Sequence, residues 1–598
     1  MLLQEQLADT VKLMKHARKV KNKEEAKLCI AVLGSCSIQF FVQAFRYVLE
    51  QRGIEANLYE GEFNGISMDV LDENSALYEK KPDIVILLTD YRDVKALPGL
   101  LATETEVERS LEEAISYYQR LWKHLEQIEG VHVFQSNFVI PDESQLGNLE
   151  CNYTFSRTLF LQQLNIELAK KRPSYVNLVD LERLAGKVGK DSWFDATGYF
   201  SYKLGFSMDY IGYVADLFAR QVEALTGKTK KCLVLDLDNT LWGGVVGDVG
   251  WEHIQLDVND AVGEAFQTFQ EYVLRLKERG VILAVCSKNE EENAKEAFKL
   301  RPEMKIKLED ISCFVANWKD KAENLITIAN TLNIGMDSLV FFDDNPAERA
   351  RVKQAHPEVY VVDVPEEPEG YIRAMEEAHP FEWIQITKED LGRTNTYVQN
   401  NRRMQYMEAA ESYEDFLISL EMQGTVREVK KEDVPRFAQL INKSNQFNLR
   451  TQRYTEAQIE RFCESEQYKC LAMLLKDKFD EYGIVSCVIL KKEKDICFID
   501  TWLMSCRVLK RGVENFVFES IVKKAIEMGC STLQGEYIQT RKNGMVTCFY
   551  EKLGFTCIEE SEDSEKAKVK KYELPRLQTR NYAQVKNNTY IERIETWN

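Results

Sequence analysis

Short apolar runs that alternate with helix-like stretches constrain the fold of this chain more than any other feature of its sequence. One series begins at KLCIAVLGSCS and continues through PDIVILLTD and VHVFQS. A second runs from CLVLDLDNT through GVILAVCSKN and SCFVAN to SLVFFDDNP. Apolar runs of this length are typical of strands buried on both faces of a parallel sheet, with helices as crossover connections. The sequence therefore predicts an α/β protein with two successive parallel-sheet domains.

The last third of the chain has a different pattern. The strand-like runs CLAMLLKDKF, GIVSCVILKK and DICFIDTWLMSC follow one another with hairpin-like links, and a helix is expected from Val513 to Met528. This predicts an α+β domain that begins antiparallel. A chain of 598 residues is too long for one hydrophobic core. We therefore predict an α/β domain at 1–226, a second at 227–380, a helical linker at 381–421, the α+β domain at 422–575 and a tail at 576–598.

Composition argues against several classes of partner. The formal net charge is −19, with the acidic excess spread along the chain, whereas a nucleic-acid binder presents a basic face. The 14 cysteines are scattered and no CxxC pair occurs, so neither zinc nor disulfides are expected. The N-terminus lacks the apolar segment of a signal peptide, and the longest apolar runs are far shorter than a membrane span. We expect a cytoplasmic protein that binds neither nucleic acid nor membrane.

Two carboxylates follow the apolar run in the centre of the chain. Asp236 and Asp238 lie two residues apart, so in a strand their side chains point the same way. They would lie at the carboxyl edge, where open α/β sheets bind ligands. Burial of such a pair is costly unless a positive group is held there. A pair of solvated loop acids is the alternative on this motif alone.

Three later segments favour a binding site at this edge. Each places polar or charged side chains at the tip of a strand or helix: Ser287 and Asn289, Lys319 and Lys321, and Asp343 and Asp344. Hydroxyl and amide groups suit a phosphate oxygen, and a helix start with lysines favours an anion. Carboxylates hold a hard cation. Together these groups predict phosphoryl transfer assisted by a bound hard cation.

These motifs strongly resemble those of the haloacid dehalogenase superfamily. DLDNT fits its DxDxT signature, and Ser287, a lysine and the two later aspartates fill its remaining motifs. The resemblance implies a Rossmann-like core in which Asp236 is the nucleophile that forms an aspartyl phosphate. Asp238 would be the general acid and then the base. Thr240 and Ser287 would position the nucleophile and the phosphate, and Asn289 would also bind phosphate.

The same resemblance implies the metal ligands and the catalytic lysine. Mg²⁺ would be held by Asp236, Asp343 and the backbone carbonyl of Asp238, with Asp344 in support. Lys321, preferred to Lys319 for its place in the helix, would be the motif lysine. The spacing between the motifs leaves no room for a large cap domain. We therefore expect an open site that admits a large substrate or a tethered arm.

Longer phrases around these motifs are also distinctive: LVLDLDNTLWGGVVGDVG, AVCSKN, LVFFDDNPAER and SNQFNLRTQRYT. Together they resemble the FkbH-like proteins of polyketide biosynthesis, in subfamily IIIC of the superfamily. Members take the glyceryl group of 1,3-bisphosphoglycerate, release phosphate and pass the acyl group to the phosphopantetheine thiol of an acyl carrier protein. The resemblance implies a glyceryltransferase/phosphatase that acts on a small-molecule acyl phosphate. A phosphatase of a small-molecule or protein phosphoester, without acyl transfer, is the alternative.

Two thiols are candidates for holding the acyl group. Cys286 precedes Ser287 at a strand tip, although strand alternation could instead turn it into the core. Cys36 lies in LGSCS, which resembles the first block of SGNH-type hydrolases with cysteine at the serine place. Their final block would fall at Asp195, but DATG contains no histidine, so hydrolysis is not expected. We interpret this first domain as an SGNH-like, degenerate binding domain, with Cys36 as an alternative acyl thiol.

The last domain resembles GNAT acyltransferases. RVLKRGVE opens a helix as their pyrophosphate loop does and FYEKLGF matches a later corner, but Lys510 stands where glycine is usual. Phosphopantetheine on a carrier has no such pyrophosphate, so this departure fits a domain that grips the carrier's arm. The predicted arm-binding residues are Asn445, Gln446, Asn448 and Arg507, and a polar turn is the alternative.

Overall fold

The computed structural model describes residues 7–227, 229–386, 412–540, 542–562, 567–577 and 590–594. The chain divides into two compact units. Unit 1 comprises Met1–Thr226 with Tyr454–Arg461, and unit 2 comprises Gly227–Arg453 with Phe462–Asn598. None of the helices in the described ranges combines the length and the hydropathy that crossing a bilayer requires.

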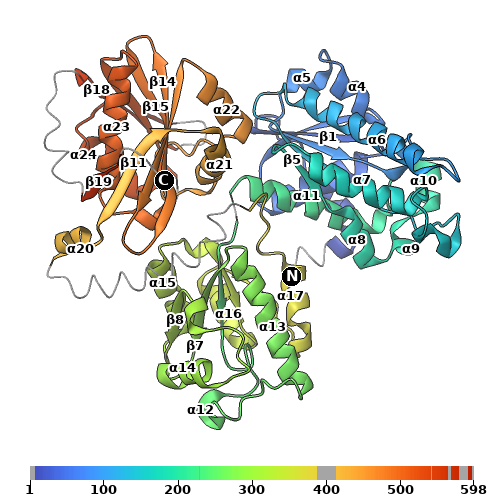
Figure 1. Cartoon of the computed structure of the whole chain (residues 1–598), viewed down its shortest axis with the longest axis horizontal. Helices are drawn as coiled ribbons and strands as arrows, with labels where there is room; N and C mark the ends of the chain where they lie inside the picture. Colours follow the sequence, from blue (N-terminus) through green and yellow to red (C-terminus); the bar gives the residue numbers. More distant parts are fainter. Residues whose placement is uncertain are drawn as a thin grey trace. The chain divides into compact units, whose positions relative to one another are not determined.

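Unit 1 is built on a parallel sheet (Figure 1). Its strand order is β2-β1-β3-β4-β5. The strands are β1 (Leu28–Gly34), β2 (Ala56–Phe63), β3 (Ile84–Leu88), β4 (His132–Ser136) and β5 (Val176–Val179). The long helices are α3 (Gln39–Gln51), α6 (Glu104–Leu125), α7 (Arg157–Lys171) and α11 (Ile211–Leu225). The short helices are α2 (Thr10–Ala17), α4 (Ile66–Leu71), α5 (Ala76–Lys80), α8 (Leu181–Val188), α9 (Lys190–Trp193) and α10 (Ala196–Tyr202).

Helical packing explains why the strands of unit 1 are apolar on both sides. The helices α6 and α7 share one apolar core with the sheet, and α3 packs against α11 through Phe41 and Phe218. Every residue of β3 is buried as a result. The predicted parallel α/β architecture is confirmed, whereas the SGNH-like identity of this domain stays a prediction.

The first part of unit 2 is a second parallel sheet, with the order β10-β9-β6-β7-β8. Its strands are β6 (Cys232–Leu235), β7 (Ile282–Ser287), β8 (Cys313–Ala316), β9 (Leu339–Phe342) and β10 (Tyr360–Val361). Its helices are α12 (Val246–Val249), α13 (Ala261–Glu278), α14 (Glu291–Leu300), α15 (Lys321–Leu332), α16 (Pro346–Ala355) and α17 (Tyr371–Ala378). The chain runs from β6 to β7 and β8 on one side and returns to β9 on the other. The topological switch point, where open α/β sheets bind ligands, therefore lies at the carboxyl ends of β6 and β9.

The second part of unit 2 is an α+β domain with the strand order β17-β18-β16-β15-β14-β13-β11-β19. Its strands are β11 (Met422–Glu428), β12 (Phe447–Asn448), β13 (Tyr468–Lys476), β14 (Glu481–Glu493), β15 (Ile496–Met504), β16 (Thr532–Ile538), β17 (Thr556–Glu562), β18 (Lys568–Leu574) and β19 (Ile591–Arg593). Its helices are α20 (Tyr413–Ser419), α21 (Val434–Lys443), α23 (Val513–Glu527) and α24 (Phe549–Lys552). Helix α22 (Glu456–Glu464) begins in the segment Tyr454–Arg461 that belongs to unit 1. The pairs β13–β14 and β14–β15 are antiparallel, as predicted, and β11, which the sequence pattern did not indicate, also pairs antiparallel with β13.

A short segment lies between two strands of this domain. The parallel strands β15 and β16 pair only over their first residues, up to Ile499 and Gly535. Beyond that point β12 pairs with the end of β15. Leu449 then donates its N–H to the Trp502 carbonyl (3.3 Å) and accepts at its own carbonyl from the Ile538 N–H (2.9 Å). The chain's own backbone therefore satisfies the strand edges where β15 and β16 diverge.

Two predicted segments have a different outcome. Most of the predicted helical linker falls on 387–411, outside the described residues. In the predicted tail, β19 adds a parallel strand beside β11, an element that the sequence pattern did not indicate.

Candidate active site

The predicted nucleophile follows directly after the central strand β6. This strand is buried at every position, and Asp236 is only 7% exposed. The N–H of Asp236 donates to the Phe342 carbonyl at the end of β9 (3.0 Å), so strand pairing continues into the site. The carboxylate oxygen Oδ1 of Asp236 is buried and has no hydrogen-bond partner. Because such an oxygen is costly to bury, it indicates a place for a cation or a reacting group.

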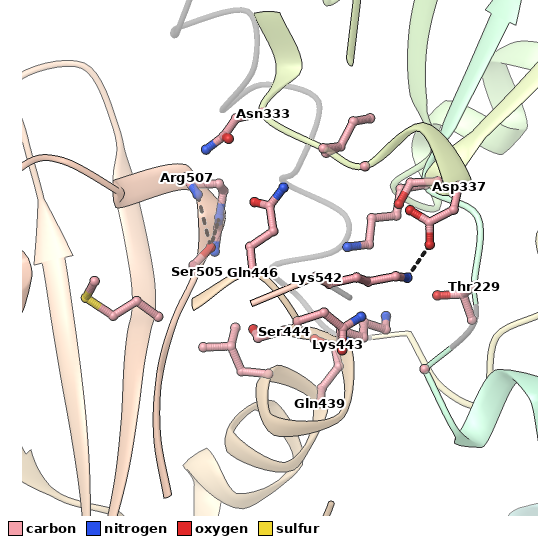
Figure 2. Close-up of a pocket in the computed structure, with 18 of the residues that line it drawn as sticks. Thr229, Asn333, Asp337, Gln439, Lys443, Ser444, Gln446, Ser505, Arg507 and Lys542 are labelled. Atoms are coloured by element: carbon pink, nitrogen blue, oxygen red, sulfur yellow. Dashed lines mark hydrogen bonds and ion pairs between the residues drawn. The ribbon is translucent and has the colours of Figure 1, made fainter. Parts of the chain in front are cut away.

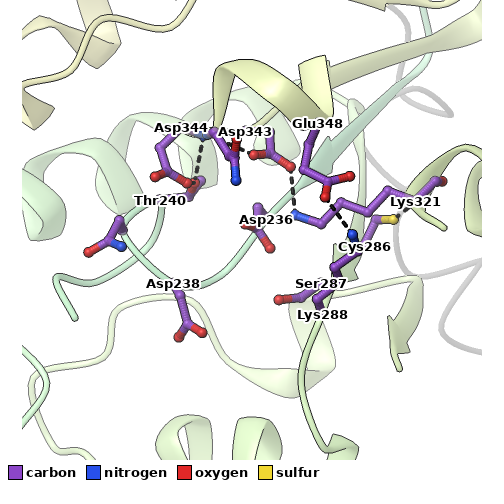
Figure 3. A network of polar contacts seen from close by, with 12 residues as sticks. Asp236, Asp238, Thr240, Cys286, Ser287, Lys288, Lys321, Asp343, Asp344 and Glu348 are labelled. Atoms are coloured by element: carbon purple, nitrogen blue, oxygen red, sulfur yellow. Dashed lines mark hydrogen bonds and ion pairs between the residues drawn. The ribbon is translucent and has the colours of Figure 1, made fainter. Parts of the chain in front are cut away.

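Three carboxylates and one lysine meet at the switch point of this sheet (Figure 3). Carboxylate oxygens of Asp236, Asp343 and Asp344 lie within 4.8 Å of one another. Lys321 Nζ is 2.6 Å from Asp343 Oδ2 and 2.9 Å from Asp236 Oδ2. The side chain of Lys321 is buried, whereas Lys319 is exposed. A cluster of carboxylate oxygens is the donor set that Mg²⁺ prefers, so these residues fit the predicted metal.

Burial and like charges set the electrostatics of this cluster. Desolvation, reinforced by the charge of Asp236, raises the pKa of Asp343 to about 7. The same two causes raise the pKa of Asp344. Desolvation acts to lower the pKa of Lys321, but Asp236 and Asp343 outweigh it and hold that pKa above its ordinary value. Lys321 therefore stays protonated, and a cation would offset the remaining negative charge.

The predicted general acid is held by three hydrogen-bond donors. Asp238 Oδ1 accepts from Trp242 Nε1 (2.9 Å) and from the Val246 N–H (3.0 Å), and Oδ2 accepts from Asn289 Nδ2 (2.9 Å). Despite these bonds, desolvation raises the pKa of Asp238, which suits an acid. Its carboxylate lies apart from the cluster of the other three aspartates (Figure 3). The metal-binding role of its backbone carbonyl stays a prediction.

The predicted phosphate-binding residues are buried and contact the acidic side chains. Thr240 Oγ1 donates to Asp344 Oδ1 (3.3 Å) and accepts from the Asp344 N–H (3.3 Å). Ser287 Oγ accepts from Asn289 Nδ2 (3.2 Å), the same nitrogen that donates to Asp238. The structure thus brings Thr240, Ser287 and Asn289 to the same edge of the sheet. It also places Asn289 against the predicted acid.

Several residues that sequence reasoning missed support this site. Arg349 Nη1 donates to the backbone carbonyls of Asp343 (2.8 Å) and Asp344 (2.6 Å) and so fixes the loop after β9. Lys288 forms an ion pair with Glu348 (2.5 Å) next to Ser287. Both Arg349 and Glu348 lie in the phrase DNPAER, directly after the predicted aspartates, and Trp242 lies in the phrase DNTLWGG. The extent of these two phrases beyond the core motifs could have indicated all three residues.

Neither candidate thiol is exposed. Cys286 is fully buried in an apolar cluster with Cys232 and Phe341, and its Sγ lies 3.8 Å from the Lys321 carbonyl. Because side chains alternate along a strand, Cys286 points into the core while the next residue, Ser287, faces the site. Burial raises the pKa of Cys286 above its ordinary range. Burial, together with the charge of Asp90, raises the pKa of Cys36 to about 12. Both thiols are therefore protonated and poorly nucleophilic here.

Three of the four predicted arm-binding residues line one cavity of about 200 Å³ in unit 2 (Figure 2). These are Asn445, Gln446 and Arg507, and Arg507 Nε donates to Ser505 Oγ (3.2 Å) in the cavity wall. The prediction for Asn448 is wrong, because this residue is buried inside the sheet. Its Nδ2 donates to the Ser444 carbonyl (3.1 Å), and its backbone carbonyl accepts from Asn543 Nδ2 (3.0 Å).

Comparisons with known proteins identify relatives of several parts of the chain. Residues 29–221 match the family model described as FkbH, N-terminal domain. The N-terminal part of the protein BF1531 from Bacteroides fragilis, whose crystal structure contains a phosphatase domain complexed with Mg, is 34% identical with a TM-score of 0.58. This match covers 63% of the present chain and 99% of that one. No curated protein matches the chain.

Acetyltransferase structures match a smaller part. The ribosomal-protein-S18-alanine N-acetyltransferase from Escherichia coli is 15% identical, with a TM-score of 0.21, over 26% of this chain and 94% of its own. Ard1 from Thermoplasma volcanium is 18% identical, with a TM-score of 0.22, over 26% of this chain and 99% of its own.

Proposed function

Because the chain belongs to the FkbH-like family of proteins with a haloacid dehalogenase-type phosphatase domain, we propose that it is a Mg²⁺-dependent glyceryltransferase/phosphatase. Its donor would be 1,3-bisphosphoglycerate and its acceptor the thiol of an acyl carrier protein. One observation carries the phosphatase part: Asp236 Oδ1 is buried without a partner, beside Lys321 and two further carboxylates. A carboxylate nucleophile next to a fixed positive charge is what phosphoryl transfer through an aspartyl phosphate requires.

Phosphoryl transfer at this site would proceed in two displacements. Asp236 attacks the phosphorus of the phosphomonoester, the bond to the leaving oxygen breaks, and Asp238 protonates that oxygen. A water molecule then attacks the phosphorus of the aspartyl phosphate while Asp238 takes its proton, which releases inorganic phosphate and restores Asp236. Lys321 offsets charge on the transferring group. Mg²⁺, when held by Asp236, Asp343 and Asp344, would supply further charge neutralisation there.

Acyl transfer would use the other end of the donor, the acyl phosphate. The carrier thiolate attacks the acyl carbon, a C–S bond forms, and the C–O bond to phosphate breaks with the electron pair leaving on phosphate. Direct transfer to the carrier is favoured because Cys286 and Cys36 are buried with raised pKa values. Asn445, Gln446 and Arg507 are the proposed contacts for the phosphopantetheine arm, since a guanidinium suits its phosphodiester.

A phosphatase without acyl transfer is the second candidate, because it needs the same aspartate–lysine cluster but no acceptor thiol. Intact-mass analysis separates the two. Carrier protein is incubated with the full chain, Mg²⁺ and 1,3-bisphosphoglycerate, and phosphate release is followed in parallel. We expect the carrier to gain the mass of one glyceryl group, and the Asp236→Asn variant to release no phosphate from the phosphomonoester. Phosphate release with an unchanged carrier mass would contradict glyceryl transfer and support a phosphatase without acyl transfer.

A further inference from the structure

The carboxylate of Asp238 has two unlike oxygens. Oδ1 accepts from the indole N–H of Trp242 and the backbone N–H of Val246, and Oδ2 accepts from the amide of Asn289. Indole and backbone N–H groups can only donate, so both partners of Oδ1 require it to remain an acceptor. An amide both donates and accepts. Asn289 can therefore partner Oδ2 with or without a proton, by turning its amide over.

The partners of Oδ1 are fixed by packing. Trp242 is fully buried and makes an edge-on ring contact with Phe298 of α14 (5.6 Å between centroids). The intervening loop is closed by Asn239, which adopts a left-handed conformation (φ 53°) and accepts from the Gly244 N–H through Oδ1 (2.9 Å). A ring held this way can move little without disturbing the core. The indole therefore sets the orientation of the Asp238 carboxylate.

Asn289 connects this carboxylate to the phosphoryl site. It is 2% exposed, and its Nδ2 lies 2.9 Å from Asp238 Oδ2 and 3.2 Å from Ser287 Oγ. Ser287 ends β7, the strand next to the one that ends before Asp236. One amide nitrogen thus bridges Oδ2 of Asp238 and the serine that is predicted to bind the phosphoryl group.

We propose that Asn289 and Trp242 are positioning residues for the general acid, and that Oδ2 of Asp238 is the oxygen that exchanges the proton with the leaving oxygen. This role differs from the phosphate contact that the sequence predicts for Asn289. The inference rests on the proposed phosphoryl transfer, in which Asp238 is the proton donor. The proposal predicts that loss of Asn289 or Trp242 slows hydrolysis most for substrates whose leaving oxygen needs a proton.

Leaving-group dependence tests this proposal. Glycerol 3-phosphate has an alkoxide leaving group that needs protonation, whereas the nitrophenolate of p-nitrophenyl phosphate leaves with little help. The full chain with Mg²⁺ is assayed on both, beside Asn289→Leu, Trp242→Phe and Ser287→Ala. Relative to wild type, we expect the ratio of alkyl to aryl kcat/KM to fall at least about tenfold in the first two variants. In Ser287→Ala both rates should fall while their ratio stays within about twofold, because a phosphate contact serves both substrates alike.

The outcomes separate this inference from the function it rests on. A wild type that hydrolyses neither ester overturns both. A wild type that hydrolyses both, with the ratio unchanged in Asn289→Leu and Trp242→Phe, overturns only the positioning role. Inhibition by orthophosphate gives a second readout. A higher inhibition constant in Asn289→Leu, with equal losses of kcat/KM on both esters, would show that Asn289 binds phosphate and would contradict its positioning role. If circular dichroism shows that Asn289→Leu is unfolded, Asn289→Ser and Trp242→Phe provide the same comparison.

Discussion

Lys321 Nζ lies 2.6 Å from Asp343 Oδ2 and 2.9 Å from Asp236 Oδ2, so one buried ammonium group joins the predicted nucleophile to the carboxylate that directly follows the neighbouring strand β9. Since desolvated charges are costly unless paired, the loss of this lysine should destabilise the domain. We expect Lys321→Met to lower the free energy of unfolding by about 3–5 kcal/mol in urea titrations without metal. Excess Mg²⁺ should restore part of the loss, and equal stability of the two proteins would contradict the buried ion pairs.

Asp236→Asn should abolish phosphate release from phosphomonoesters and keep the fold. The amide has the shape of the carboxylate but cannot attack phosphorus. Asp344→Asn is the matched comparison, because it removes a carboxylate of the same cluster without removing the nucleophile. It should retain measurable turnover at raised Mg²⁺ concentration. Near-normal turnover by Asp236→Asn would remove this residue as nucleophile.

Removal of divalent metal should stop phosphate release from phosphomonoesters. In its absence Lys321 is left to offset three clustered carboxylates and the incoming phosphate. Full activity in excess EDTA would contradict the metal assignment. Mg²⁺ should also raise the melting temperature of wild type through binding to the folded state, and Asp343→Asn should reduce that increase.

The site's main groups could be predicted because parallel strands bring their carboxyl ends to one edge. Asp236, Ser287 and Asp343 follow or end such strands, and Asp320 caps the start of the helix that carries Lys321. The hydrogen bonds of Asp238 could not be predicted in the same way. They depend on a loop that returns through a left-handed residue to Trp242, and no periodicity in the sequence encodes that path.

Long-range pairing explains the remaining differences. The strand β12 is only Phe447–Asn448, too short for an alternation pattern, and it forms because β15 and β16 diverge beside it. Asn448 therefore became a sheet residue, although its polarity predicted a binding surface. Arg450 follows this segment and forms ion pairs with Asp500 (2.8 Å) and Glu536 (2.8 Å), one on each flanking strand.

The two ion pairs of Arg450 predict a stability effect without a direct effect on phosphoryl chemistry. The side chains are mostly buried, so Arg450→Met leaves two carboxylates without their cation. We expect a loss of about 3 kcal/mol in the unfolding free energy of the α+β domain. Hydrogen exchange of the amides in β15 and β16 should report it, with the amides of β6 and β7 as an internal control. Unchanged protection of β15 and β16 would contradict a stabilising role for the two ion pairs of Arg450.

Asp90 in unit 1 predicts a pH dependence of stability. Burial raises its pKa to about 6, against an ordinary value of 3.8, although Arg92 lies 2.8 Å away. A carboxyl group whose pKa is higher in the folded state stabilises the fold at low pH, and that contribution is lost as the pH rises through about 4 to 6. Asp90→Asn does not titrate. Between about pH 4 and 7, the unfolding free energy of wild type should therefore decrease more than that of Asp90→Asn, by up to about 3 kcal/mol. Parallel pH curves would contradict the raised pKa.

The two buried thiols yield the prediction that decides how the acyl group travels. Cys286 lies in the apolar core behind Ser287, and Cys36 is buried in unit 1 with a pKa of about 12, so neither offers a thiolate near neutral pH. We expect Cys286→Ala and Cys36→Ala each to load carrier protein within about twofold of wild type, after correction for a stability loss of about 1 kcal/mol from the removed side-chain volume. Enzyme given 1,3-bisphosphoglycerate without carrier should show no acyl adduct on peptides containing either cysteine. An adduct on one peptide, lost together with carrier loading in the matching alanine variant, would show instead that this thiol becomes exposed during turnover and relays the glyceryl group.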